Sequence, residues 1–166
     1  MTRTLRLTAL AAFATFATAP SLSAQQYRVE LSVPGGKIAI AEFLPCTSAA
    51  DPGCGAWVDR TIQLRGAAPR LVPSLVSPNG HDSVSVEDGR VRIKTLDGRT
   101  PPISFLRIGE GIARGVAISA DSRYAFVVVA NVLGNPADVI MIDLATQNGV
   151  VGLVMDARVL GIRMAP

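Results

Sequence analysis

The fold class of this chain is set by one stretch, Gly115-Val116-Ala117-Ile118-Ser119-Ala120-Asp121-Ser122-Arg123-Tyr124-Ala125-Phe126-Val127. Its two apolar runs flank a short turn of small and acidic residues, and each run has the length and the Val, Ile and aromatic content of a β-strand. Tyr124 to Ala130 and Val139 to Leu144 are apolar on both faces, which is typical of central strands in a sheet. We find no long amphipathic helix after residue 24, so we predict an all-β fold.

Shorter strand signals precede this stretch. Tyr27 to Val33, Lys37 to Phe43 and Trp57 to Leu64 are each of strand length. Farther on, two segments that alternate apolar and polar residues flank Asp88-Gly89. An Asp-Gly pair in that setting predicts a hairpin whose turn residues have positive φ.

A strand-turn-strand unit recurs along the chain. Ser77-Pro78-Asn79-Gly80 and Ser119-Ala120-Asp121-Ser122 each follow an apolar stretch and introduce a hydrophobic strand, and they lie 42 residues apart. Four strands can be counted in each unit, and a four-stranded unit of about 40 residues is typical of a propeller blade. Gly161 to Met164 is either the opening strand of a third repeat or a closing strand that completes an earlier blade.

The segment from Gly115 to Val127, together with Asp138 to Thr146, resembles the YVTN-type, WD40-like β-propeller repeat. That family has a Gly-(apolar)-Ala-(apolar)-Ser-Pro-Asp-Gly-(basic)-Tyr-Ala-Tyr-Val opening and an (apolar)-Ile-Asp-Leu-Ala-Thr close. The likeness is good from about residue 111 to 166 and weak from 71 to 109, and Ala120 and Ser122 replace the usual Pro and Gly. The resemblance implies antiparallel four-stranded blade-like sheets in a partial β-propeller, with Asp143 in a structural position. A small β-sandwich is the alternative fold.

We therefore divide the chain into three parts. Residues 1–24 are a signal peptide, residues 25–70 an N-terminal β region with a disulfide-closed loop, and residues 71–166 two propeller-like repeats, about 71–110 and 111–155, plus the start of a third. Closed propellers need about four to eight blades. Three interpretations follow: a shortened form of a longer propeller, a half-ring that closes by oligomerising, or a sandwich with propeller-like strands. Open sheet edges predict self-association.

The first 24 residues have the pattern of a secretory signal. Arg3 and Arg6 are followed by an uncharged apolar stretch from Leu7 to Ala19, and small residues lead to a predicted cleavage after Ala24. The apolar stretch is shorter than the about 20 residues that span a bilayer, so we expect no stable membrane anchor. Cleavage lowers the formal net charge from +3 to about +1, because both arginines leave with the signal. We expect a periplasmic or secreted protein that binds no nucleic acid.

The two cysteines, Cys46 and Cys54, are separated by a turn signal at Asp51-Pro52-Gly53. In an oxidising compartment we expect them to form a disulfide. A metal site would need further ligands, and His81 is the only histidine. Redox pairs usually have the shorter C-x-x-C spacing.

No catalytic, cofactor or metal site is predicted. His81-Asp82-Ser83 has the residue types of a hydrolytic triad, but neighbours on a strand point to opposite faces. Gly109-Glu110-Gly111 with Gly115 misses the phosphate-binding glycine spacing and precedes a strand. The acids at positions 51, 88, 97 and 121 fall in turns.

Single aromatic residues on strands, here Trp57, Tyr27 and Tyr124, more often belong to the core or cover a sheet than line a pocket. The leading hypothesis is therefore an exported binding or scaffold module without enzymatic activity, whose partner is a protein or a second copy. The alternatives are a subunit or truncated form of a lactonase-like or quinoprotein-like propeller enzyme, and a structural surface β-sandwich.

Overall fold

The structure is a computed structural model that describes residues 25–46, 53–96, 103–106, 111–130 and 137–166. All regular secondary structure within these residues is β. The strands are β1 (Tyr27–Val33), β2 (Lys37–Leu44), β3 (Gly55–Gln63), β4 (Ser74–Val76), β5 (Asp82–Glu87), β6 (Arg90–Thr95), β7 (Ile103–Leu106), β8 (Ile112–Ile118), β9 (Tyr124–Ala130), β10 (Ala137–Asp143), β11 (Asn148–Met155) and β12 (Gly161–Met164).

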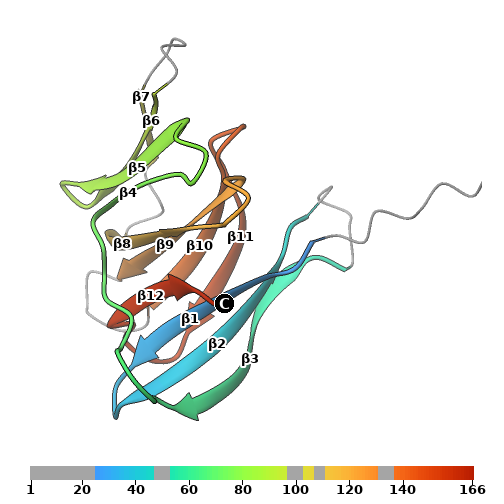
Figure 1. Ribbon diagram of the computed structural model, residues 1–166, viewed down its shortest axis with the longest axis vertical. Helices are drawn as coiled ribbons and strands as arrows, with labels where there is room; N and C mark the ends of the chain where they lie inside the picture. The colour runs from blue at the N-terminus through green and yellow to red at the C-terminus, as the bar shows by residue number, and fades with distance from the viewer. Residues whose placement is uncertain (1–24, 47–52, 97–102, 107–110, 131–136) are drawn as a thin grey trace, which may run out of the picture.

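The strands form three antiparallel sheets of four strands each. Sheet A has the order β12-β1-β2-β3, sheet B the order β4-β5-β6-β7, and sheet C the order β11-β10-β9-β8. Sheet C lies in the middle of the molecule, with sheet B above it and sheet A below it (Figure 1). This confirms the predicted all-β class with four-stranded, blade-like sheets of a partial propeller.

Sheet A combines both ends of the described chain. β12 pairs antiparallel with β1 and occupies the position that β4 and β8 occupy in the other two sheets. The backbone N–H of Ala165 donates to the carbonyl of Arg28 at 3.0 Å, as that of Ser119 donates to the carbonyl of Tyr124 at 2.9 Å. Of the two interpretations of β12, the one in which it completes a blade with earlier strands describes this pairing.

The turns that follow β4 and β8 share one hydrogen-bond pattern. The Ser119 hydroxyl donates to Asp121 at 2.6 Å and accepts the backbone N–H that begins β9 at 3.0 Å. The Ser77 hydroxyl donates to Asn79 at 2.7 Å and accepts the backbone N–H of the first β5 residue at 2.9 Å. The 42-residue repeat seen in the sequence is therefore also a repeat of turn structure.

Positive backbone φ angles occur where the turn signals predict them. Asp88 and Gly89 have φ of 52° and 73°, the signature of the tight hairpin turn expected between β5 and β6. Ser122 has φ of 62°, close to the 74° of Gly80 at the equivalent position in sheet B. The turn of sheet C thus keeps its shape although serine replaces the usual glycine, and the left-handed φ strains the serine.

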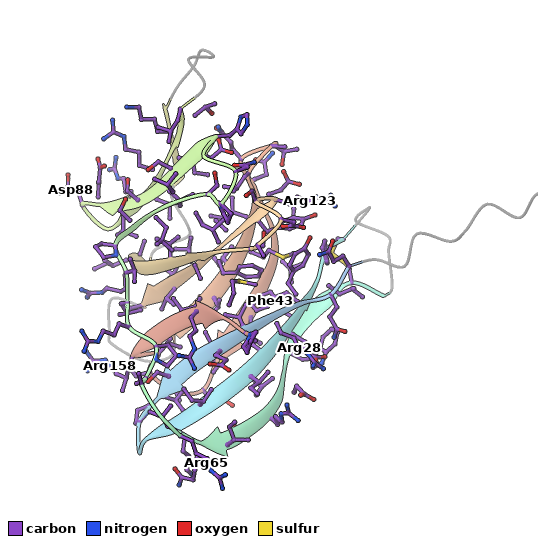
Figure 2. The ribbon with its side chains drawn as sticks, viewed as in Figure 1. Arg28, Phe43, Arg65, Asp88, Arg123 and Arg158 are labelled. Atoms are coloured by element: carbon purple, nitrogen blue, oxygen red, sulfur yellow. A yellow bond between two sulfur atoms is a disulfide. The ribbon has the colours of Figure 1, made fainter. Side chains whose placement is uncertain are left out.

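The core has two layers, one on each face of sheet C. Phe126 of β9 packs edge-on against Phe43 of β2 with ring centroids 5.1 Å apart, and Phe43 lies between sheets A and C (Figure 2). The neighbouring residue Val127 points the other way and joins a second cluster with Val84 and Ile93 of sheet B. β9 is apolar on both faces because both faces are covered, as the sequence predicted for Tyr124 to Ala130.

Residues 66–73 connect sheet A to sheet B and lie along two edge strands, β12 of sheet A and β8 of sheet C. We call this segment the strap. The carbonyl of Arg70 accepts the N–H of Ile162 at 3.3 Å, and the carbonyl of Val72 accepts that of Val116 at 2.9 Å. A Cβ on Gly161 would lie 1.9 Å from the Pro69 carbonyl oxygen, so only glycine permits this approach. The strap therefore covers two strand edges that would otherwise expose unpaired backbone groups.

Candidate functional site

Sheets A and B each pack one face against sheet C and turn the other face away from it. On strands β4 to β6 the open face of sheet B is polar apart from Val76, and the register of β7 places Ile103 and Phe105 on the same face. It holds a shallow hollow of about 420 Å³ whose polar lining comprises Ser74, Ser83, Ser85, Glu87, Arg92 and Lys94. The part of this face that β4 to β6 form is suited to water rather than to another protein surface.

The open face of sheet A has a different composition. Strand register arranges its side chains in three rows across the sheet: Arg28, Glu42 and Trp57; then Arg163, Glu30, Ile40 and Arg60; then Ser32, Ile38 and Ile62. Charged pairs thus alternate with large apolar side chains. We identify this open face of sheet A as the candidate functional site.

The first row contains a buried carboxylate beside an exposed indole. Glu42 is only 6% exposed, and its Oε1 accepts a hydrogen bond from Arg28 Nε at 2.8 Å and forms an ion pair with Nη2 at 2.7 Å. Gln26 donates to the other carboxylate oxygen. Trp57 lies directly across the strand pair from Glu42 and is 42% exposed. Tyr27 and Tyr124 are buried in the core as expected, whereas Trp57 is not.

The second and third rows contain a hollow of about 400 Å³. Its aliphatic lining is Ile38, Ile62 and Leu64, and its charged lining is Glu30, Arg65 and Arg163. Arg163 donates through Nε to Glu30 at 2.6 Å and through Nη1 to the carbonyl of Ala67 in the strap at 3.3 Å. The arginine of β12 therefore joins the open face to the strap.

Sequence reasoning did not single out this surface. A signal for it exists in β2, where Ile38 and Ile40 occupy positions that alternate with the core residues Ala39, Ala41 and Phe43. Both faces of β2 are thus apolar, although only one of them is covered by sheet C. The position of Trp57 could not be predicted, because a bulge at Asp59 shifts the register of β3 against β2.

Tyr27 and Asp121 form a polar contact between sheet A and the turn that joins β8 to β9 of sheet C. Tyr27 Oη donates to Asp121 Oδ2 at 2.7 Å, and Asp121 Oδ1 accepts from the Ser119 hydroxyl and the Arg123 N–H. Burial raises the pKa of Tyr27, as do the hydrogen bond and the charge of Asp121. Partial burial opposes ionisation of Asp121, but the hydrogen bonds from Ser119, Tyr27 and Arg123 hold its pKa below the usual range. A neutral phenol held by an ionised carboxylate is a structural contact rather than an acid-base pair.

The residues of the triad-like motif do not converge. His81 lies in the exposed turn before β5, where its N–H donates to Asn79 Oδ1 at 3.0 Å. The Asp82 carboxylate accepts from Thr95 Oγ1 at 3.4 Å, whereas Ser83 lines the hollow on the open face of sheet B. The side chains of Asp82 and Ser83 therefore lie on opposite faces of sheet B, as the alternation of side chains along a strand predicts.

The carboxylate of Asp143 has the structural role that the family resemblance implied. Its Oδ1 accepts the backbone N–H groups of Ala145 and Thr146, each at 2.9 Å. Asp51, Asp97 and Gly109 lie outside the described residues. Among the residues that the structure does describe, no group of three or more His, Cys, Asp or Glu side chains could hold a metal ion.

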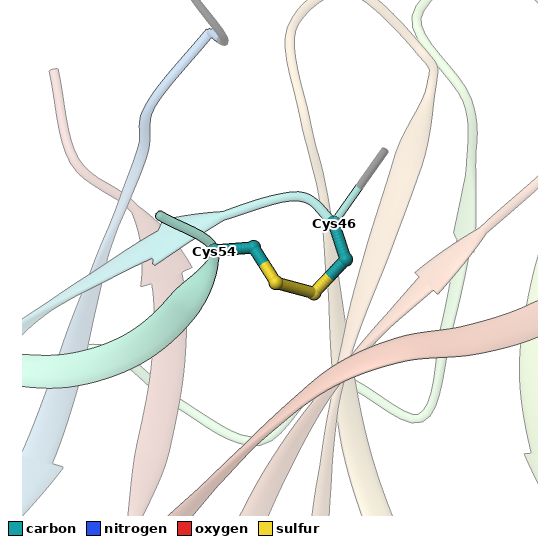
Figure 3. Close-up of a disulfide and its surroundings, with 2 residues drawn as sticks. All are labelled: Cys46 and Cys54. Atoms are coloured by element: carbon teal, nitrogen blue, oxygen red, sulfur yellow. A yellow bond between two sulfur atoms is a disulfide. The ribbon is translucent and has the colours of Figure 1, made fainter. Parts of the chain in front are cut away.

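The Cys46 and Cys54 sulfur atoms are bonded at 2.06 Å and join the end of β2 to the start of β3 (Figure 3). Cys46 also packs against the core between sheets A and C. The disulfide thus ties together the two strands that carry most of the open face of sheet A. The predicted cleavage site at Ala24 lies outside the described residues. Across the described ranges, the structure contains no helix with the length and apolar content to span a membrane.

Comparison with known proteins gives weak structural likenesses only. No protein-family model matches the chain, and no curated protein matches it. The chain is similar to the dihydro-heme d1 dehydrogenase NirN in complex with DHE, with 17% identity and a TM-score of 0.46, over 84% of this chain and 28% of that one. It is similar to a functionally unknown protein from Desulfotomaculum acetoxidans DSM 771, with 13% identity and a TM-score of 0.39, over 76% of this chain and 36% of that one.

A third similar structure is the WD40 domain of SCAP from fission yeast, with 16% identity and a TM-score of 0.35, over 82% of this chain and 31% of that one. The chain thus spans about a third of the length of each of these three proteins. The three blade-like sheets themselves define the fold class: an all-β protein with the architecture of a partial β-propeller.

Proposed function

We propose that this chain is an exported binding or scaffold module without enzymatic activity, acting in the periplasm or outside the cell. Its binding surface is the open face of sheet A, and its partner is a protein. One observation carries the proposal: this face exposes Trp57 and Ile62, which lie beside the buried residues Ile38 and Ile40, and neither sheet B nor sheet C covers it. Apolar surface of this kind, rimmed by charged groups, is typical of protein interaction sites.

The face is a better candidate for binding than the edge of the same sheet. β3 is the outermost strand of sheet A, but Asp59 forms a bulge in it and Arg60 follows directly. Bulges and charges on edge strands oppose the addition of a further strand. The proposal therefore replaces association through sheet edges with association through a sheet face. A second copy of the chain remains the competing partner.

Site-specific photocrosslinking in the producing cell tests this function. Benzoylphenylalanine replaces Ile62 on the open face of sheet A, and in a matched control it replaces Val76, an exposed apolar residue on the open face of sheet B. We expect a discrete crosslinked adduct with a second protein from position 62 only. Adducts of the chain with itself would show self-association instead. Equal labelling from both positions, or none from either, would contradict the proposal.

Export is tested separately. Sequencing of the N-terminus of the protein recovered from the periplasm or the medium is expected to begin at Gln25. A variant with Leu7 and Leu10 replaced by Arg is expected to stay in the cytoplasm at full length, because the apolar segment of a signal does not tolerate charge. Efficient release of that variant would exclude a signal of this kind.

A further inference from the structure

The hollow on the open face of sheet A has the chemistry to recognise one class of partner segment. From the proposed function we infer that the partner presents a short acidic peptide, in which an aliphatic side chain enters the hollow and a neighbouring carboxylate meets Arg65. This inference deepens the proposed function and rests on it. It names the charge and the side-chain type of the partner.

The shape of the hollow argues for a short segment. Its volume of about 400 Å³ is at the small end of the range of roughly 300–1,000 Å³ for ligand pockets. Ile38, 2% exposed, lies in the floor, while Ile62 is 45% exposed and forms one wall. A site of this size accepts one or two side chains, and aliphatic walls favour aliphatic ones.

The charges around the hollow argue for an acidic segment. Arg163, which lines the hollow, is neutralised by Glu30 at 2.5 Å, and Arg28, in the first row of the same face, is neutralised by Glu42 at 2.7 Å. Arg65, which lines the same hollow, makes no ion pair with any residue that the structure describes. Figure 2 shows Arg65 at the foot of sheet A, extending outward beyond the end of β3.

Arg65 therefore adds an uncompensated positive charge next to an apolar floor. The other arginine that lines the hollow, Arg163, is already paired with Glu30 and needs no further carboxylate. A partner carboxylate at Arg65 would complete the charge balance of the face, whereas a partner lysine there would be repelled. An arginine guanidinium can also bind a carboxylate through two parallel hydrogen bonds, which orients the bound segment.

Fluorescence polarisation with two labelled peptides tests the inference on the mature chain. One peptide has two leucines followed by two glutamates in a glycine-serine frame, and the other has two lysines in place of the glutamates. We expect the acidic peptide to bind about twofold to fivefold more tightly than the basic one, the range that a single exposed charge can supply.

Two variants and one control locate the effect. Arg65→Glu is expected to reverse the preference between the two peptides, and Ile62→Ser, which removes the apolar wall without adding a charge, to weaken binding of both peptides. Arg90→Glu removes an exposed arginine from the hairpin of sheet B and should change neither affinity. Because positions 62, 65 and 90 are exposed, all three variants should fold, and circular dichroism and thermal melts verify this.

The outcomes separate this inference from the proposed function. Equal affinity for both peptides, an unchanged preference in Arg65→Glu, or tighter binding to phosphatidylglycerol vesicles than to the acidic peptide would overturn the inference. A crosslinked protein partner at position 62 would still support the proposed function in each of these cases. Reversal of the preference by Arg65→Glu alone would support the acidic-segment assignment.

Discussion

The Tyr27 hydroxyl donates a hydrogen bond to the Asp121 carboxylate at 2.7 Å and thereby joins the first residue of β1 to the turn between β8 and β9. The same tyrosine ring packs edge-on against Tyr124 with centroids 4.9 Å apart. The Asp121 carboxylate also accepts hydrogen bonds from the Ser119 hydroxyl and the Arg123 N–H. Sheet A is thus fixed to sheet C by an apolar contact and a charged hydrogen bond at one place, and the open face of sheet A is held in a defined orientation.

Replacing Tyr27 by Phe removes this hydrogen bond while keeping the ring in the core. We expect the free energy of unfolding to fall by about 1–2 kcal/mol, because a hydrogen bond to a charged group contributes about 1.5–3 kcal/mol and Asp121 is partly solvated. Urea denaturation of Tyr27→Phe, Asp121→Asn and the double variant measures the coupling energy of the pair. Additive losses in the double variant would show that the two side chains do not interact.

Acid should weaken the protein through Asp121. Hydrogen bonds hold the pKa of this carboxyl in the folded state below its unfolded value of about 3.9. Its contribution to stability is therefore complete above about pH 4 and is lost as the pH falls through the folded pKa. Thermal melts between about pH 5 and pH 2 should show a smaller decline for Asp121→Asn than for the parent chain. Identical declines would assign the acid sensitivity to other carboxylates.

Alkali should weaken the protein through Tyr27. The pKa of Tyr27 is raised by burial and by the neighbouring carboxylate, so the folded state favours the neutral phenol. The corresponding stability is present below the unfolded value of about 10 and is lost as the pH rises above it. Tyr27→Phe should therefore lose less stability than the parent chain between about pH 9 and pH 11 in urea titrations. An equal loss in both proteins would argue against a raised pKa.

The close contact between the strap and β12 can be tested by a substitution at Gly161. An alanine at Gly161 would place its Cβ 1.9 Å from the Pro69 carbonyl oxygen, so the backbone must shift. We expect Gly161→Ala to cost about 1–3 kcal/mol, as overpacked sites do, and to speed hydrogen exchange at the N–H groups of Ile162 and Val116. Gly152→Ala is the matched control, since nothing lies within 4 Å of its added Cβ. Similar effects of both changes would mean that the strap does not constrain β12.

Loss of the disulfide should destabilise the sheet that carries the open face. The bond between Cys46 and Cys54 closes a short loop, and the chain-entropy model gives about 2–3 kcal/mol for its removal. The double variant Cys46→Ser and Cys54→Ser should therefore melt at a lower temperature than the oxidised parent. Reduction of the parent with dithiothreitol should give the same shift, and the variant itself should not respond to dithiothreitol. A dithiothreitol response in the variant would indicate a different cause.

Local features of the fold follow from short-range patterns and could be predicted. The hairpin at Asp88-Gly89 needs positive φ at two successive residues, and an Asp-Gly pair adopts these angles with little strain, whatever the tertiary position of the hairpin. The turn after β8 could be aligned with that after β4, because Ser119 and Ser77 each bond to a residue two positions on. The candidate site was not predictable in the same way. Trp57 and Ile62 are strand residues whose exposure depends on whether another sheet covers them.

Residue order alone was therefore enough to predict the β-strands, their tight turns and the repeated unit, because periodicity and turn chemistry act over a few neighbouring residues. Only the tertiary structure decided that β12 pairs with β1, that Tyr27 reaches Asp121 and that sheet A keeps one face uncovered. These features depend on contacts between segments about 90 or more residues apart. The packing of sheets A and B against sheet C is stabilised by the burial of apolar side chains on both faces of sheet C. No local pattern encodes which faces meet.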